Sequence, residues 1–147
     1  MKKVILIAYI LLGLVFVSLA QTKHTVGEKW GGGVVFVVVA DGLHGLIAET
    51  QDQGKDTWDN AKALIRNSSN HSDAGKAFTD WRLPEKGELN LLYYQKDIVG
   101  GFASDLYWSS SELGSRYSYA WVQDFNDGRQ DDDDKTFPTR VRAVRAF

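Results

Sequence analysis

The chain has 147 residues, with 17 Lys and Arg against 19 Asp and Glu, 5 Trp, 6 Tyr, 7 Phe and no Cys. The lack of Cys excludes a disulfide framework, a Cys-ligated zinc or iron–sulfur site and a thiol nucleophile. The formal charge of −2 gives no excess of positive charge for a phosphate backbone, so we expect no nucleic-acid partner, and the length predicts one compact domain.

Residues 1–20 have the pattern of a secretory signal peptide. Lys2 and Lys3 precede an apolar run over 4–17, and Ser18-Leu19-Ala20 places small residues just before Gln21. The alternative is an uncleaved anchor, because the apolar stretch approaches the roughly 17 to 25 residues that span a bilayer. Cleavage predicts a secreted or surface-displayed protein that is not inserted in the membrane, with a lead-in over 21–32 and one domain over 33–147.

The first predicted unit of the domain is a β-hairpin. Residues 34–39 are β-branched or aromatic on both faces, which predicts a central, buried strand. Asp41-Gly42 supplies positive-φ positions for a tight turn, and residues 44–48 return as the partner strand.

Two helices are predicted next. The first is capped by Asp56 or Thr57 and ends near Arg66, and its buried face has three-and-four spacing at Trp58, Ala61, Leu64 and Ile65. Residues 67–79 are rich in Asn, Ser and Gly and predict an exposed loop. The second helix follows Pro84 and ends before Gly100, with Leu89, Leu92 and Tyr93 on one face.

The remaining elements are short strands. They are predicted over 107–111, 119–123 and 141–147, with a hairpin turn at 126–128. Asp131 to Asp134 would repel one another at a strand centre, so we expect a solvated acidic loop there. The order of elements predicts an α+β fold, with two helices and a mostly antiparallel sheet.

No catalytic or metal-binding pattern is present. His24, His44 and His71 have no paired metal-ligand spacing, and we expect His44 to be a hydrogen-bonded structural residue. A nucleophile elbow and a phosphate-binding glycine loop are also missing. We therefore predict no enzyme activity, no cofactor and no metal; calcium bound by Asp131 to Asp134 is the alternative to a solvated loop.

Several motifs together resemble one bacterial family. They are Asp80–Pro84 (DWRLP), Glu88-Leu89, Leu91–Tyr93, Tyr107–Glu112 (YWSSSE), His44–Leu46 and the ending Arg140–Phe147 (RVRAVRAF). From about Gly33 onward the chain resembles the family that contains the C-terminal domain of collagen-like adhesins, and within it the variable proteins of diversity-generating retroelements. The resemblance implies a C-type-lectin-like fold in which the DWRLP and WSSSE segments, including Trp81 and Trp108, are framework. It also implies that the C-terminal segment binds ligand.

The assignment to the variable proteins rests on residues 113–140. Diversification replaces template adenines by any base, and a template Asn codon can then never give Lys, Glu, Gln, Met or Trp. Between Leu113 and Arg140 these residue types occur only at positions that the resemblance makes framework, namely Trp121, Gln123, Gln130 and Lys135.

The residues between these framework positions are the candidate ligand contacts. They mix aromatic, apolar and charged types in no period of a strand or helix, so they cannot all face one core. Such a mixture suits a binding surface, although ordinary loop residues are the alternative. The candidates are Leu113, Ser115, Arg116, Tyr117, Tyr119, Val122, Asp124, Asp127, Arg129, Asp131, Asp132, Asp133, Asp134, Thr136, Phe137 and Arg140.

The expected function is a secreted or surface-displayed binding module with a protein or cell-surface ligand. A fixed adhesin domain that binds glycans is one alternative, although six carboxylates in the candidate segment would repel sulfated glycans. A lectin-fold relic of a formylglycine-generating type of enzyme is another, but that chemistry depends on Cys.

We expect export to remove residues 1–20. Replacing Ala20 with a bulky residue should block processing, because signal peptidase requires small residues next to the cleavage site. N-terminal sequencing of the exported wild-type protein should find Gln21. Exported protein that still begins with Met1 would contradict this prediction.

Overall fold

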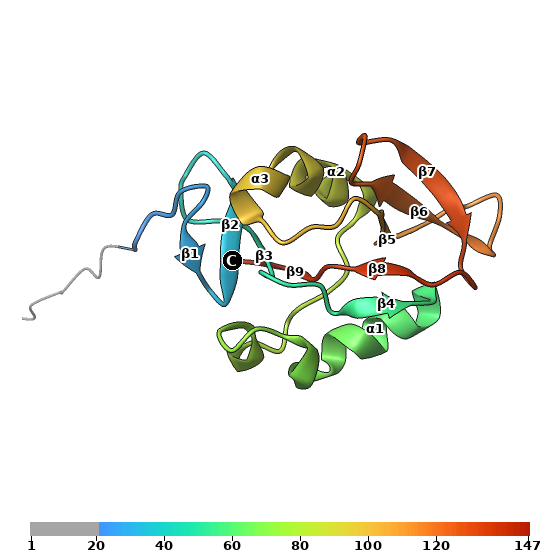
Figure 1. Ribbon diagram of the computed structural model, residues 1–147. Coiled ribbons are helices and arrows are strands. Elements are labelled where there is room, and N and C mark those ends of the chain that lie inside the picture. Colours follow the sequence, from blue (N-terminus) through green and yellow to red (C-terminus); the bar gives the residue numbers. More distant parts are fainter. Residues whose placement is uncertain (1–20) are drawn as a thin grey trace, which may run out of the picture.

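The computed structural model describes residues 21–147, which form two sheets, three α-helices and two short 3₁₀ helices, Ser68–Asn70 and Gly75–Ala77 (Figure 1). The predicted signal peptide, residues 1–20, lies outside the described residues. None of the helices within 21–147 has the length and apolar character that crossing a membrane requires.

The first sheet has four antiparallel strands in the order β1-β2-β3-β9. They are β1 (Lys29–Trp30), β2 (Gly33–Val38), β3 (Gly45–Ala48) and β9 (Val144–Ala146). β2 lies between two partners, and its first four residues are buried, which confirms the predicted central strand. The β2–β3 hairpin is also confirmed. Its turn differs from the prediction, because only Gly42 adopts positive φ, at 76°, and Asp41 does not. The carboxylate of Asp41 instead accepts hydrogen bonds from the N–H groups of Leu43 and His44.

The second sheet has five strands in the order β4-β8-β5-β6-β7. They are β4 (Gly54–Asp56), β5 (Leu106–Glu112), β6 (Tyr119–Asp124), β7 (Gln130–Asp134) and β8 (Thr139–Val141). Only the β5–β8 pairing is parallel, so the mostly antiparallel arrangement that we expected is confirmed. The predicted last strand, 141–147, is divided between β8 and β9, and the chain thereby passes from one sheet to the other.

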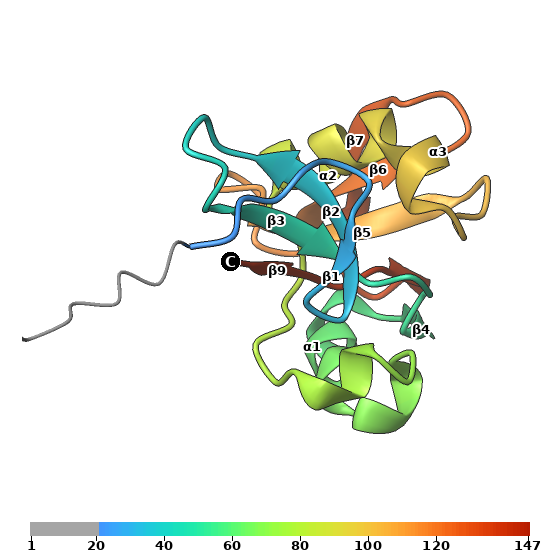
Figure 2. The same cartoon turned by 90° about the vertical axis from the view of Figure 1, so that its left-hand side faces the viewer.

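The two main helices lie on opposite sides of the five-stranded sheet (Figures 1 and 2). They are α1 (Trp58–Arg66) and α2 (Lys86–Tyr94), and α2 is followed by the short α3 (Lys96–Val99). One apolar core, which includes Trp58, Trp108 and Val141, involves α1. A second core, which includes Phe36 and Leu89, lies between the two sheets and α2. The predicted α+β fold with two main helices is confirmed.

The cap of α1 differs from the prediction. Thr57 occupies the N-cap position, but its side chain makes no capping hydrogen bond. Asp56 instead accepts hydrogen bonds from the Thr57 N–H and the Asn60 side chain. At the start of α2, the carboxylate of Glu88 reaches back to the N–H of Glu85. Such a bond satisfies a donor that has no partner within the helix.

The predicted acidic loop is wrong, because Asp131 to Asp134 form most of β7. This strand lies at the edge of the sheet, where its outer side is open to water. Successive side chains of a strand also point to opposite faces, which separates neighbouring carboxylates. In addition, Asp131 and Asp133 each accept a hydrogen bond from the N–H of the following residue, both at 2.9 Å.

The segment 67–79 is not only an exposed loop, because His71 is buried in it. His71 Nδ1 lies 2.9 Å from the carboxylate of Glu49, which is fully buried, and Nε2 donates to the Ile65 carbonyl. Ser72 donates its hydroxyl to the same carboxylate. Gly75 fits beside it because a Cβ at this position would lie only 2.0 Å from Glu49 Oε2. This cluster joins the segment to the end of β3.

Two of the three predicted framework tryptophans are core residues. Trp81 and Trp108 are buried, and each donates its indole N–H to a backbone carbonyl, those of Gly75 and Asp56. Trp121 is half-buried, and Lys86 Nζ lies 3.0 Å from its ring centre. Trp121 therefore contacts the scaffold through a cation–π interaction and does not lie in the core.

These environments predict different costs of truncation. Trp108→Ala should lower the free energy of unfolding by about 3 to 5 kcal/mol, because it leaves a cavity in the core. Trp121→Ala should cost only about 1 kcal/mol, because it removes a half-buried cation–π contact. Urea denaturation of both variants measures the difference. Equal losses would contradict this assignment.

Candidate ligand-binding face

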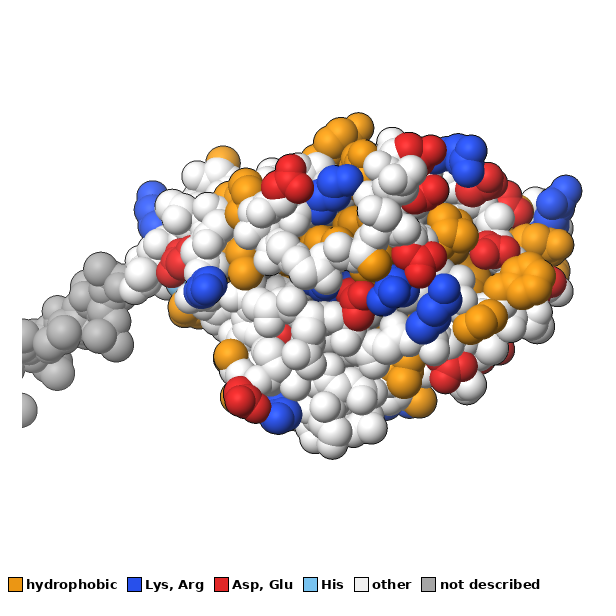
Figure 3. Space-filling view, viewed as in Figure 1, with side chains coloured by type: hydrophobic (Ala, Val, Ile, Leu, Met, Phe, Trp, Pro, Cys, Tyr) orange, Lys and Arg blue, Asp and Glu red, His pale blue; other side chains and the backbone are white. Residues whose placement is uncertain are grey.

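The predicted contact residues belong to the β6–β7 hairpin and its flanking loops, except for Arg140, which lies in β8. In Figure 1 these strands lie at the end of the molecule opposite to residue 21 and the C-terminus. The space-filling view shows hydrophobic, acidic and basic side chains intermingled at this end (Figure 3). We call residues 113–119 and 132–137 the tip.

Strand register divides the candidates between two faces of the hairpin. Tyr119 pairs with Asp134 and Trp121 with Asp132, so these four side chains share one face. Val122 pairs with Asp131, and these two residues belong to the opposite face. Tyr119 and Val122 therefore lie on opposite faces, and the candidate contacts do not form one surface.

Exposed side chains of mixed chemistry lie at the tip. Tyr117 is 83% exposed at the end of the β5–β6 loop. The guanidinium of Arg116 lies 5.6 Å from the ring centre of Tyr119, and 3.9 Å from the carboxylate of Asp132. In the neighbouring β7–β8 turn, Phe137 is 57% exposed. The tip thus presents two aromatic rings and a cation to solvent.

The second face has a shallow hollow of about 210 Å³. Val122 contributes to its lining but is only 1% exposed and packs in the core with Trp108, so its predicted role as an exposed contact is wrong. Strand alternation explains this, because Val122 follows the outward Trp121. The remaining lining residues are Leu106, Asp124, Arg129, Asp131, Asp132 and Asp133.

Several candidate side chains are engaged in local hydrogen bonds. Asp124 and Asp127 each accept a backbone N–H two residues further along the chain. Asp134 accepts from both the N–H and the hydroxyl of Thr136, and the bond from that N–H holds the pKa of Asp134 below its usual range. These carboxylates shape turns.

Arg140 is also engaged, within the scaffold. Its guanidinium lies 2.9 Å from Asp105 and 3.2 Å from Asp52. The hydrogen bond to Asp105 raises the pKa of Arg140. Burial opposes ionisation of Asp105, but bonds from the Leu106 N–H, Lys55 and Arg140 hold its pKa below the usual range. Arg140 thus has partners within the fold.

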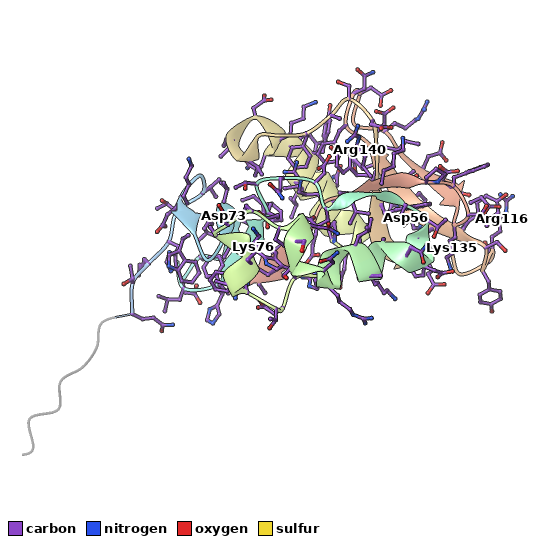
Figure 4. The ribbon with its side chains drawn as sticks, turned by 60° about the horizontal axis from the view of Figure 1, so that its bottom comes forward. Asp56, Asp73, Lys76, Arg116, Lys135 and Arg140 are labelled. Carbon is purple, nitrogen blue, oxygen red and sulfur yellow. The ribbon has the colours of Figure 1, made fainter. Side chains whose placement is uncertain are left out.

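Lys135 fixes the tip. Its ammonium donates to the carboxylate of Glu112 at 2.6 Å and to the carbonyl of Tyr117 at 2.7 Å, and it lies 4.3 Å from the ring centre of Trp58. Its N–H donates to the carbonyl of Ser118. Lys135 thus joins the two loops of the tip to each other and to α1. Figure 4 shows it close to Arg116 at the same end of the ribbon.

No arrangement for catalysis or metal binding is found within residues 21–147. No group of three or more His, Cys, Asp or Glu side chains in this range could hold a metal ion. The three His lie in separate environments: His24 stacks on Trp30, His71 is bonded to Glu49, and His44 lies 2.7 Å from Asp41 on the surface. The expectation that His44 is hydrogen-bonded is confirmed.

Removing the ammonium of Lys135 should loosen the tip. Lys135→Met loses both hydrogen bonds but retains an unbranched side chain, so backbone amides at 114–118 should exchange faster with solvent. The cost in stability should be about 1 kcal/mol. The matched control is Lys55→Met on β4, which removes the salt bridge between Lys55 and Asp105. This variant should leave exchange at 114–118 unchanged. Unaltered exchange in Lys135→Met would contradict the role of Lys135.

Comparison with known proteins places this architecture in a family. The family model described as the Lcl C-terminal domain matches residues 37–145. No match was found among curated proteins. The matched range extends from β2 to β9 and contains α1, α2 and the whole hairpin that carries the candidate face. The chain therefore belongs to the Lcl C-terminal domain family, the domain of collagen-like adhesins that its sequence motifs resemble.

Proposed function

We propose that this protein is an exported binding module whose tip contacts a protein or cell-surface ligand. The observation that carries the proposal is the exposure of Tyr117 and Phe137, at 83% and 57%, on loops joined by Lys135. Large aromatic side chains gain much contact area for little lost conformational entropy. Loops that are already restrained also lose less entropy on binding.

The position of the tip supports this function. Residue 21 and the C-terminus lie at the other end of the molecule (Figure 1). A domain attached to a surface at either end of the chain would therefore direct the tip outward. Ligand contact at the tip would not compete with attachment.

We further propose that the tip is diversified, as in the variable proteins of diversity-generating retroelements. The support is that each residue type excluded by adenine replacement contacts the scaffold. Trp121 stacks under Lys86, and Gln130 donates to the Lys86 carbonyl. Gln123 donates to the side chain of Asn90 on α2 at 3.4 Å, and Lys135 fixes both loops. Residues that hold the hairpin in place are thus of types that diversification of a template Asn codon does not produce.

The structure narrows the proposed contact set. Val122 is removed because it is buried, and Arg140 is removed because it has partners within the fold. Five carboxylates are removed because each accepts a backbone N–H, those of Asp124, Asp127, Asp131, Asp133 and Asp134. Arg129 is removed because it lies outside the tip. The retained contacts are Leu113, Ser115, Arg116, Tyr117, Tyr119, Asp132, Thr136 and Phe137.

Genomic DNA distinguishes the diversified protein from a fixed adhesin domain. The proposal predicts a near-copy of the codons for 113–140, differing at template adenines, beside a reverse transcriptase gene. A gene without such a copy would indicate a fixed adhesin domain. The binding role of the tip would still stand in that case.

Variants of the exposed aromatic residues test the binding role. Tyr117→Ser and Phe137→Ser should each reduce binding of labelled protein to a panel of intact bacterial and eukaryotic cells by about tenfold, as for loss of an aromatic anchor. Stability should change by less than about 0.5 kcal/mol, because both side chains are exposed. Tyr94→Ser is the matched control, because Tyr94 is 73% exposed on α2, outside the tip.

Cell binding and melting temperature are measured for all three variants. Binding that survives both tip substitutions would argue against the tip as the contact surface. A loss as large in Tyr94→Ser would indicate a nonspecific effect of removing surface tyrosines.

A further inference from the structure

A second groove lies outside residues 113–140, between α1 and the DWRLP segment. It has a volume of about 260 Å³ and is lined by Lys62, Arg66, Arg82, Glu85 and Ser110 around an apolar floor. A second hollow of about 230 Å³, which includes Lys76, adjoins it and shares the residues Ile65, Arg66 and Trp81. Together the two hollows border the last turn of α1.

The rim of the groove carries positive charge that the fold does not neutralise. Lys62 and Arg66 lie one helical turn apart, and neither forms a salt bridge with another described residue. Lys62 Nζ lies 4.9 Å from the ring centre of Trp58, a cation–π contact that brings no formal negative charge. Like charges at this spacing repel each other on a helix.

The other end of the groove carries one guanidinium and two carboxylates. Arg82 forms a two-pronged pair with Glu88, at 2.6 and 2.7 Å, and the hydrogen bond to Glu88 raises the pKa of Arg82. Glu85, the carboxylate that lines the groove, contributes to the same rise. A negatively charged ligand would therefore be attracted mainly by Lys62 and Arg66.

The floor selects the chemistry of the ligand. Ile65, Trp81 and Leu83 form it, and the indole N–H of Trp81 is already donated to the Gly75 carbonyl. The floor thus offers apolar contact and no free indole donor. A peptide can place an apolar side chain on the floor and pair its carboxylates with the cations of the rim. A polysaccharide anion supplies the charge but no apolar side chain.

We propose that this groove binds an extended acidic segment of a partner protein. One apolar side chain of the segment lies on the floor, and flanking carboxylates pair with Lys62 and Arg66. All of the groove residues lie outside the tip, so this site is independent of the ligand and of any diversification there.

Peptide binding to the full chain tests this site. The first probe is a fluorescent pool of short peptides in which Asp or Glu alternates with Leu, Phe or Trp. The second is a poly-Glu peptide, and the third is heparin, a polyanion without apolar side chains. We expect the first probe to bind more tightly than the other two, and added salt to weaken its binding.

Charge reversal locates the binding. The double variant Lys62→Glu with Arg66→Glu should weaken binding of the first probe by about tenfold, corresponding to the loss of two partly exposed ion pairs. The matched control is Lys23→Glu with Lys29→Glu, which reverses two exposed cations elsewhere and should bind normally. The control should keep the wild-type melting temperature, because both side chains are exposed. Lys62→Glu with Arg66→Glu should remain folded with a slightly lower melting temperature, because it removes basic side chains from the C-terminal end of α1.

Three results would overturn the proposal. The first is that no peptide of the first pool binds at millimolar concentration. The second is equal loss in both double variants, which would show a dependence on net charge alone. The third is that heparin or poly-Glu binds as tightly as the first pool, which would show a general anion patch.

Discussion

The fold depends on one buried guanidinium, that of Arg142. It lies in the short link between β8 and β9, where the chain passes from the five-stranded sheet to the four-stranded sheet, and it is completely buried. Its Nε donates to Asp52, its Nη1 donates to the carbonyls of Glu49 and Gly100, and its Nη2 donates to the carbonyl of Gly101. A charge buried to this degree is tolerated only when its donors are satisfied. Arg142 therefore requires the end of β3, the segment before β4 and the loop after α3 to converge on one point, and Asp52 extends the network to Tyr107 and Arg140.

That network is the part of the structure that the sequence could least predict. Arg142 lies in a repetitive basic ending, where nothing local separates it from the half-buried Arg145, and its partners are 41 to 93 residues away in the chain. The buried pair of Glu49 and His71 was missed for the same reason, because it joins a strand end to a segment rich in Asn and Ser. The helix at 58–66 was predictable, because its apolar spacing is a local signal that needs no knowledge of the partner.

The sequence marked out the segment that we propose as the binding face, but not its division between two faces. The segment 113–140 forms one hairpin with its loops, as expected of a continuous surface feature, yet its strand register places Trp121 and Val122 on opposite faces. Composition alone could not reveal this, because the mixed segment has no clear period and Val122 is a residue type that both a core and a variable face accept. The acidic strand illustrates the same limit. Asp has low β propensity, but the edge position of β7 and the hydrogen bonds of Asp131 and Asp133 to the next N–H groups override it.

The residues that stabilise the fold are separate from the tip residues that we propose to bind a ligand. Both apolar cores and the Arg142 network lie between the sheets and helices, and the tip is joined to them through Lys135 and through the contacts of Trp121, Gln123 and Gln130. An exposed tip residue can then change without leaving a cavity or an unpaired buried group, which are the main causes of large losses in stability. The groove beside α1 stands in a different relation to the fold, because its floor residues Ile65 and Trp81 are themselves part of a core. Its shape is consequently tied to the fold, which suits the invariant partner proposed for it, whereas the exposed residues of the tip can change without altering the core.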